Sequence, residues 1–212
     1  MAQSLKSLNS FDLIHDNCTY SFRLVDLFNL SVEDEKLYVI LTQDFEAAKG
    51  AYGNAVAQAF YYASFAKPKI AFETIKSKIS EAKSKTEGYQ RYDWFVFTSD
   101  KFVGTASVRT PDYDLGNILG GAITSPVWEL SATVSKDFRS KHITSNLVGQ
   151  FVKYISQQFP THVQLVRVNP DNEMVKHLVT KHNFKPVGKN QVAMDLKVIT
   201  MTFDYDVYVL SN

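Results

Sequence analysis

Residues 127–147, VWELSATVSKDFRSKHITSNL, change their pattern at one point. Residues 127–134 form a short apolar and β-branched run, which predicts a strand. From residue 143 the apolar positions recur at helical spacing, and Pro160 ends that pattern. The apolar face of this helix consists of Ile143, Leu147, Phe151, Val152 and Ile155. A strand, a turn and a helix in this order favour an α/β fold with a mixed sheet flanked by helices.

The pattern extends outward in both directions from this unit. Ser99-Asp100-Lys101 is a turn that joins two strands into a hairpin. A second helix is expected after the strand at 163–168, with Asn169 as its cap and Pro170 in its first position, and Asn183 ends it. The strands expected here are residues 92–98, 102–109, 117–119, 163–168 and two strands within 192–210.

The N-terminal part is expected to be mainly helical. Alanine-rich residues 45–66 favour a helix, and Pro68 opens another one that ends at Glu87-Gly88. The apolar face of that second helix is Phe72, Ile75, Ile79 and Ala82. Residues 37–41 are a short apolar run, which predicts a strand, whereas 11–35 show no decisive pattern. We expect a single domain over residues 1–212 with a helical N-terminal extension.

Composition excludes several classes of protein. The chain has 212 residues, 45% of them hydrophobic, and a net charge of +1, which excludes a disordered chain. No apolar run is long enough to span a membrane, and the first ten residues do not resemble a secretory signal. The single cysteine, Cys18, indicates a reducing, cytoplasmic location. No metal-binding or nucleotide-binding motif is present. The net charge gives no signal for nucleic acid, although residues 67–91 carry a local charge of +4.

Three stretches, in this order, point to one family. They are SDKFVGTA at 99–106, ELSATVSKDFRSKHITSNL at 129–147, and NEMVKHLVTKHNFKPVG at 172–188. Together they resemble a divergent member of the GCN5-related N-acetyltransferase (GNAT) superfamily, and the resemblance is strongest over residues 92–200. It implies a GNAT-like fold, acetyl-CoA as co-substrate and acetyl transfer to an amine by direct attack on the thioester.

The resemblance also assigns residues to coenzyme A. In the family, one strand pairs with the pantetheine arm, and the helix start after it presents backbone N–H groups to the pyrophosphate. The positions implied here are Ser131, Thr133, Val134, Arg139, Lys141, His142, Ile143, Thr144 and Asn172. This site requires a V-shaped opening between the strands at 127–134 and 163–168.

The chain departs from the family pattern at three positions. His142 and Thr144 stand where glycines let the backbone approach the phosphates, and Val179 stands where many members carry a tyrosine that protonates the leaving thiolate. These departures leave an alternative open. The chain could be a catalytically inactive GNAT-fold protein with a structural role, a protein partner or a homo-oligomeric assembly.

Glu129 is the candidate general base, because burial on a strand beneath the acceptor site would raise its pKa. Asp112 and Asp114 in the loop before that strand are further candidates. The acceptor pocket is expected to come from residues 45–66, the 110–126 loop and the C-terminal hairpin. The sequence does not indicate which amine it binds.

Overall fold

A computed structural model describes residues 8–15, 17–42, 44, 50, 68–119, 125–139, 141–195 and 200–210. The described strands form one eight-stranded sheet in the order β1-β2-β3-β4-β5-β6-β8-β7, and β5 and β6 are its parallel pair. The strands are β1 (Phe11–His15), β2 (Cys18–Val25), β3 (Arg91–Thr98), β4 (Lys101–Arg109), β5 (Val127–Val134), β6 (Val163–Val168), β7 (Lys185–Asp195) and β8 (Thr200–Leu210). The expected mixed sheet is therefore confirmed.

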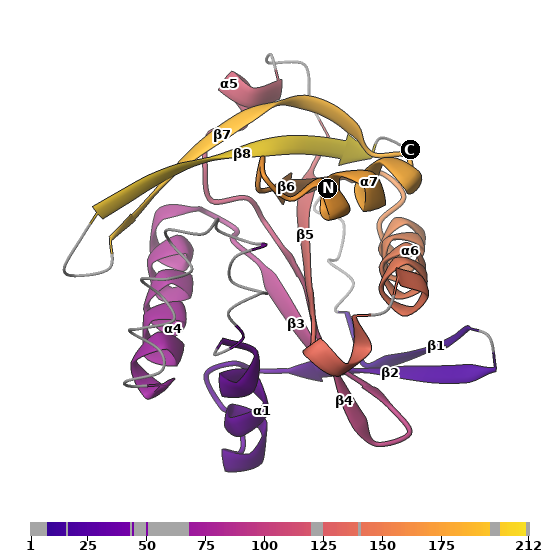
Figure 1. Ribbon diagram of the computed structural model, residues 1–212. Coiled ribbons are helices and arrows are strands. Elements are labelled where there is room, and N and C mark those ends of the chain that lie inside the picture. Colours follow the sequence, from indigo (N-terminus) through magenta and orange to yellow (C-terminus); the bar gives the residue numbers. More distant parts are fainter. Residues whose placement is uncertain are drawn as a thin grey trace, which may run out of the picture.

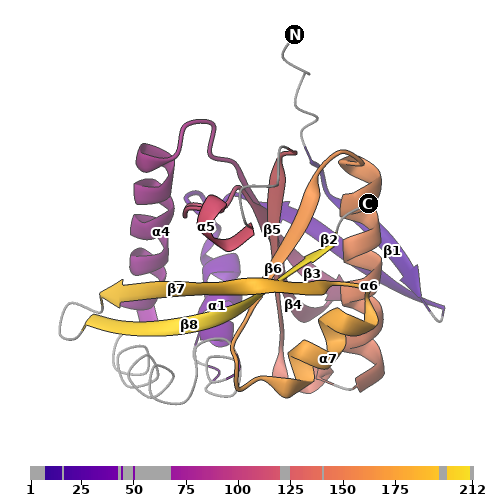
Figure 2. The ribbon, with the colours of Figure 1, turned by 90° about the horizontal axis from the view of Figure 1, so that it is seen from above.

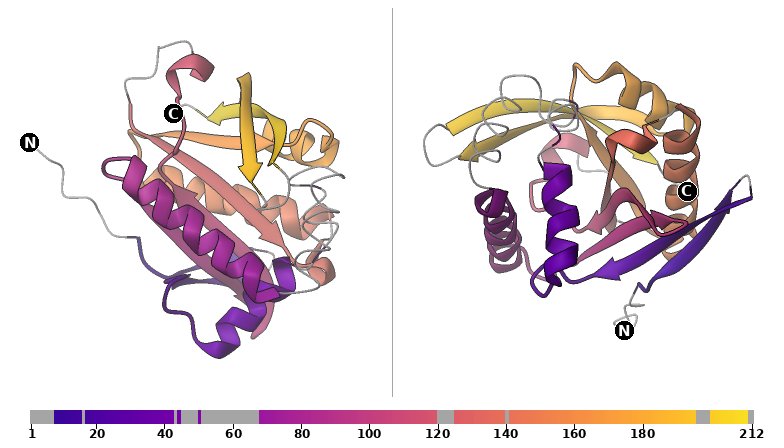
Figure 3. Two further views of the ribbon diagram at one scale, coloured as in Figure 1. Left: turned by 90° about the vertical axis from the view of Figure 1, so that its left-hand side faces the viewer. Right: turned by 60° about the horizontal axis from the view of Figure 1, so that its bottom comes forward.

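Helices cover both faces of the sheet. They are α1 (Val32–Thr42), α4 (Pro68–Lys85), α5 (Gly116–Leu119), the 3-10 turn η1 (Lys136–Phe138), α6 (Lys141–Gln158) and α7 (Glu173–Lys181). Figure 1 shows β7 and β8 crossing the molecule at a large angle to β5. Seen from above, α1 and α4 lie on one side of the sheet, and α6 and α7 lie on the other (Figure 2). The helices α1 and α4 lie side by side (Figure 3).

Alternating side chains of β3 show how the two faces are packed. Trp94 packs edge-on against Phe151 of α6, with ring centroids 5.7 Å apart. Its neighbour Phe95 points to the other face, where it meets Tyr38 of α1 at 6.3 Å. Both residues of β3 are fully buried, as the period of two in a strand requires when both faces are covered.

The hairpin of β3 and β4 has the predicted turn. Ser99 and Asp100 both have positive φ, 46° and 64°, as in a two-residue turn between antiparallel strands. Gly104 follows in β4 opposite Val134 of β5, with a φ of 157° that L side chains rarely adopt. A Cβ on Gly104 would lie 2.0 Å from the carbonyl oxygen of Thr133. The glycine in the 99–106 stretch is therefore required by strand packing.

The predicted strand at 37–41 is wrong, because these residues lie inside α1. Ser31 begins this helix by accepting a hydrogen bond from the Asp34 backbone N–H through its Oγ, at 3.1 Å. The acids of the first turn also favour the positive end of the helix dipole. A five-residue apolar run is too short to distinguish strand from helix, and the cap decides here.

Two further boundaries differ from the prediction. Residues 117–119 belong to the short helix α5, not to a strand, because the Asp114 carboxylate accepts from the Gly116 backbone N–H at 2.8 Å. Helix α7 begins at Glu173 with Asn172 as its N-cap, whereas Asn169 makes a turn by accepting from the Asp171 backbone N–H. Asn183 ends the helix with a φ of 65°, as predicted.

The N-terminal part contributes strands as well as helices. Residues 11–25 form the hairpin β1–β2, which continues the sheet beyond β3, and helix α4 buries Phe72, Ile79 and Ala82 as predicted. The helix predicted over 45–66 lies outside the described residues, apart from Gly50. Every helix among the described residues is too short or too polar to span a lipid bilayer.

Candidate active site

The strands β5 and β6 separate after a short stretch of pairing. They are in register over Val127–Val163, Trp128–Gln164 and Glu129–Leu165, and no β5–β6 pair follows among the described residues. On its other side β5 stays paired with β4 as far as Val134. We call the point where β5 and β6 part, just after Glu129 and Leu165, the strand fork. This divergence of the two strands is consistent with the V-shaped opening expected for a CoA site.

Glu129 lies at the strand fork and is bound by two arginines. Its carboxylate accepts from Arg109 Nη2 at 3.2 and 3.1 Å and from Arg167 Nε at 2.8 Å. Arg109 is the partner of Glu129 on β4, whereas Arg167 lies on β6, two residues beyond the last pair with β5. The Arg167 side chain therefore reaches back across the strand fork. Glu129 is only 5% exposed, so these ion pairs are shielded from water.

The Arg167 guanidinium lies over two aromatic rings. Its Cζ is 4.6 Å from the ring centre of Tyr113 and 5.2 Å from that of Tyr205. Its Nη1 donates to Asn190 Oδ1 at 3.1 Å. Tyr113 comes from the 110–126 loop, and Asn190 and Tyr205 come from β7 and β8. Two of the three segments expected to form the acceptor pocket thus meet at the strand fork.

The prediction that burial raises the pKa of Glu129 is wrong. Burial does oppose ionisation of this carboxyl, but the charges of Arg109 and Arg167 outweigh it and hold the pKa below the ordinary value of 4.5. The carboxylate is ionised at neutral pH and already accepts three hydrogen bonds. Glu129 is thus a weak base, and its oxygens already accept hydrogen bonds from the two arginines. The raised pKa on which its assignment as general base depended is therefore corrected.

Three of the predicted cofactor residues lie on β5 beyond the strand fork. Ser131 is exposed, Thr133 is half-buried and Val134 is buried. Ser131 Oγ is hydrogen-bonded to Ser107 Oγ of β4 at 2.7 Å. The edge of β5 that faces away from β4 has no ladder partner here among the described residues, so it could pair with an extended ligand such as a pantetheine arm.

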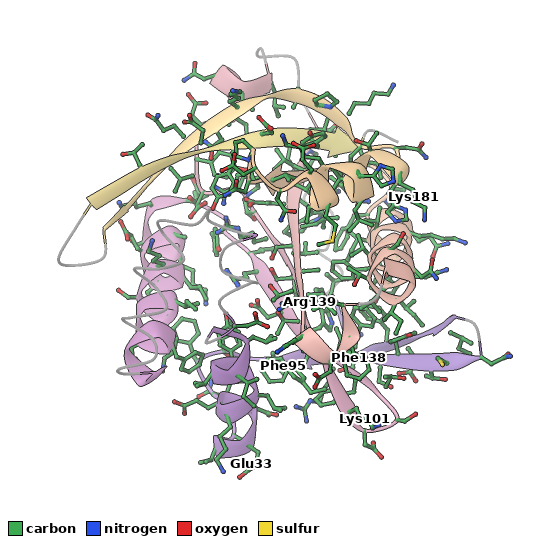
Figure 4. The ribbon with its side chains drawn as sticks, viewed as in Figure 1. Glu33, Phe95, Lys101, Phe138, Arg139 and Lys181 are labelled. Carbon is green, nitrogen blue, oxygen red and sulfur yellow. The ribbon has the colours of Figure 1, made fainter. Side chains whose placement is uncertain are left out.

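Arg139 lies at the end of β5, just after η1 (Figure 4). Its Nε donates to the Val134 carbonyl oxygen at 2.9 Å. Its two terminal nitrogens both contact the Asp44 carboxylate, Nη1 at 3.1 Å and Nη2 more closely. A carboxylate of the protein therefore already holds the side chain that the resemblance assigns to the phosphate.

The other predicted phosphate contacts lie in the first turn of α6. Lys141 and His142 begin this helix, and the positions of their side chains lie outside what the structure describes. Ile143 packs against the hydrophobic core, and Thr144 is half-buried. The first turn of a helix directs backbone N–H groups beyond its end, here toward the end of β5. The helix start needed for an anion is therefore present, although two side chains replace the glycines.

Asn172 makes two hydrogen bonds. Its Oδ1 accepts from the Val175 backbone N–H at 3.1 Å and caps α7, while its Nδ2 donates to the Gly50 carbonyl at 2.8 Å. Val179, at the position of the family's tyrosine, is 5% exposed and belongs to the hydrophobic core. The side chain at residue 179 thus packs inside the fold, and it cannot supply a proton.

Sequence reasoning missed the two arginines and the tyrosine that surround Glu129. Arg109 and Arg167 each stand near the end of an otherwise uncharged strand, FVGTASVR and VQLVRV. A charged residue in such a run indicates a buried partner of opposite charge. That signal could have identified both arginines. Nothing in the sequence, however, pairs Tyr113 or Tyr205 with Arg167, because that contact depends on how the loop and the C-terminal hairpin fold over the sheet.

The parallel β5–β6 pair that opens into a strand fork, followed by a turn and helix at the end of β5, defines the GNAT fold. Similar solved structures include an uncharacterized protein from Bacillus halodurans, with a TM-score of 0.63 and 9% identity over 97% of this chain and 92% of that one. A spermidine N-acetyltransferase from Vibrio cholerae, solved with CoA and spermine, has a TM-score of 0.53 and 12% identity over 90% and 92%.

A third similar structure is an acetyltransferase from Salmonella typhimurium that modifies the N-terminal serine of a ribosomal protein. It has a TM-score of 0.55 and 11% identity over 91% of this chain and 95% of that one. No protein-family model matches the sequence, and no curated protein matches it. The chain therefore has the fold of the GNAT acetyltransferases, at a sequence identity that establishes the fold alone.

Proposed function

We propose that this protein is an N-acetyltransferase that transfers the acetyl group of acetyl-CoA to an amine. The observation that carries the proposal is the strand fork, where β5 leaves its pairing with β6 after Glu129 and keeps its pairing with β4. A free strand edge that leads to a helix start suits a ligand with an amide-containing arm and a pyrophosphate. The solved structures of similar fold, some of them with CoA bound, support the same assignment.

The residues present fit this co-substrate in most respects. The edge of β5 at Ser131, Thr133 and Val134 would pair with the pantetheine arm. The first turn of α6, from Lys141 to Thr144, would bind the pyrophosphate through its backbone N–H groups, with Arg139 as a side-chain partner. Asn172 would donate its amide N–H to the CoA arm in place of Gly50. Arg139 would have to exchange its contact with Asp44 for the phosphate.

In the proposed reaction the amine nitrogen attacks the thioester carbonyl carbon, the carbon–sulfur bond breaks, and the thiolate leaves with the electron pair. The amine must lose one proton. We assign to Glu129 the role of a positioning residue that holds Arg109 and Arg167 at the strand fork, because its oxygens are engaged and its pKa is lowered. Asp112, which is exposed and lies 3.7 Å from Arg109, is the better candidate to accept the proton.

The test is isothermal titration of the full chain with acetyl-CoA, with desulfo-CoA as a second ligand, followed by an assay of thiol release with a panel of amines. We expect micromolar binding and amine-dependent release of CoA. The absence of binding at millimolar acetyl-CoA would contradict the proposal and would favour a catalytically inactive GNAT-fold protein. Asp112→Asn should lower kcat without changing acetyl-CoA affinity. We further propose a single domain over residues 1–212 and a cytoplasmic location for the reaction.

A further inference from the structure

The residues at the strand fork indicate which kind of amine the protein acetylates. This inference rests on the proposed function. Arg167 uses Nε for Glu129 and Nη1 for Asn190, and its Nη2 makes no hydrogen bond to any described residue. The Arg167 side chain is only 14% exposed, and its guanidinium lies over the rings of Tyr113 and Tyr205. The guanidinium is therefore held in one orientation with a donor nitrogen still available.

Tyr113 supplies a second unused donor beside Arg167. Its hydroxyl is buried, and the described carboxylate nearest to it in effect is that of Glu129, with which it makes no well-formed hydrogen bond. Its ring lies 4.6 Å from the Arg167 guanidinium carbon. Leaving a buried hydroxyl without a partner costs free energy, so such a group commonly has a ligand or a water as its partner. Burial and then the charge of Glu129 raise the pKa of Tyr113 against the opposing charges of Arg167 and Arg109, and hydrogen bonding to Glu129 raises it further. The hydroxyl therefore stays protonated and able to donate. The Glu129 oxygens already accept from both arginines.

Among the described residues, the charges at the strand fork do not favour a polycationic ligand. Within hydrogen-bond distance, the two guanidiniums of Arg109 and Arg167 share a single carboxylate, that of Glu129. The next described carboxylate, Asp112, lies 3.7 Å from Arg109 and contacts it without a hydrogen bond. A polyamine needs several free carboxylates, and here the buried one is already fully engaged. An anionic group, in contrast, would find the Arg167 guanidinium, the Tyr113 side chain packed against it and the neighbouring Arg109.

We infer that the acceptor is an amine that also carries a carboxylate, and that Arg167 Nη2 and the Tyr113 hydroxyl bind this carboxylate. A planar guanidinium with a hydroxyl beside it matches the two oxygens of a carboxylate. Binding the carboxylate at the strand fork would leave the amine of the same molecule free to reach the thioester. Specificity would come from charge pairing, since an acceptor without the carboxylate would leave both donors unpaired.

The test compares α-amino acids with the matching amino-acid amides and with spermidine, using thiol release at saturating acetyl-CoA. We expect kcat/KM for the acids to exceed that for the amides by about tenfold or more, the usual effect of a hydrogen-bonded charge pair. Tyr113→Phe should lower this ratio several-fold and leave the affinity for acetyl-CoA unchanged. Arg167→Lys should lower the ratio further, because a lysine cannot bind Glu129, Asn190 and a carboxylate together.

Tyr89→Phe is the matched control. The Tyr89 hydroxyl is also buried without a partner, but its electrostatic contact is with Arg109 and not with Arg167. This variant should keep the wild-type ratio of acids to amides. Equal use of acids, amides and spermidine, or an unchanged ratio in Tyr113→Phe, would overturn the inference. The inference would also be overturned if the protein bound acetyl-CoA but acetylated no carboxylate-bearing amine. The proposed function would survive that result. Failure to bind acetyl-CoA would instead contradict the proposed function itself.

Discussion

Arg139, in the turn after β5, and Asp44, just after α1, form an ion pair between positions 95 residues apart in the sequence. Arg139 is the side chain that the GNAT resemblance assigns to the CoA pyrophosphate. Its partner Asp44 is 15% exposed at the side chain, and Arg139 is 26% exposed. The protein therefore holds a carboxylate at the place where a phosphate is expected.

Asp44→Asn should strengthen the binding of CoA. Removing the carboxylate frees Arg139 for the phosphate, and the gain expected from a partly exposed ion pair is about two- to fivefold in Kd. Isothermal titration at low and high salt measures this effect, which should shrink as salt screens the phosphates. Arg139→Gln should weaken CoA binding, and in that background Asp44→Asn should bring no gain. A gain that persists in the double variant would show that Asp44 acts through another residue.

The contribution of Glu129 to the free energy of unfolding should depend on pH. Its pKa in the folded protein is lowered by Arg109 and Arg167 against the effect of burial, whereas the unfolded chain has the ordinary value of 4.5. The stability that Glu129 contributes is therefore complete above that value and is lost as the pH falls through the lower, folded pKa. Urea unfolding at pH 7 should show Glu129→Gln less stable than wild type by about 3–5 kcal/mol, since two buried guanidiniums lose their carboxylate.

Asp112→Asn is the control for that measurement. Asp112 contacts Arg109 only at 3.7 Å and is more exposed than Glu129, so its removal should cost less than about 1 kcal/mol. The difference in stability between wild type and Glu129→Gln should decrease toward pH 3. A constant difference across this range would mean that the ionised carboxylate is not what stabilises the strand fork.

Gly104→Ala should destabilise the sheet. The added Cβ would lie 2.0 Å from the Thr133 carbonyl oxygen, so β4 and β5 would have to move apart. Overpacking of this kind costs about 2–3 kcal/mol, measurable by thermal or urea unfolding. Gly116→Ala is the comparison, because its Cβ would meet only the flexible Asp114 carboxylate, at 3.2 Å. Equal stability of the two variants would contradict the close approach of the strands.

Asn172→Asp should separate the two roles of Asn172. Aspartate caps a helix as well as asparagine does but cannot donate to the Gly50 carbonyl. Asn172→Asp should therefore lose only the stability of that hydrogen bond, whereas Asn172→Ala loses the cap too and should be less stable by about 1 kcal/mol more. Both variants lack the amide donor that now binds the Gly50 carbonyl. We expect both to bind CoA about tenfold more weakly. Wild-type affinity in both would restrict Asn172 to its role as a cap.

The sequence predicted the central part of the fold well. The turn at Ser99 and Asp100 and the end of α7 at Asn183 were recognisable because each needs a backbone conformation that few residues adopt readily. The residues 163–168 were recognisable as a strand from their apolar run. Elements whose type depends on a cap were less predictable, as α1 and α5 show: Ser31 and Asp114 decided them through single hydrogen bonds.

The candidate site was predictable only in part. The resemblance located the strand, the turn and the helix start around residues 129–144, and the structure brings them together beside the strand fork. It did not indicate that Arg139 would be held by Asp44 or that Glu129 would be held by two arginines. Both contacts join segments far apart in the chain, and neither follows from local spacing.

The sequence by itself determined the order of strands and helices from β3 to α7, apart from α5, because hydrophobic period, caps and turn residues act over a few neighbouring positions. Only the tertiary structure decided the protonation and the partners of the charged residues. The pKa of Glu129 depends on whether burial or neighbouring charge prevails, and Arg167 reaches it only because β6 leaves β5 at the strand fork. Electrostatic energies depend on distance in space, which a one-dimensional pattern does not contain.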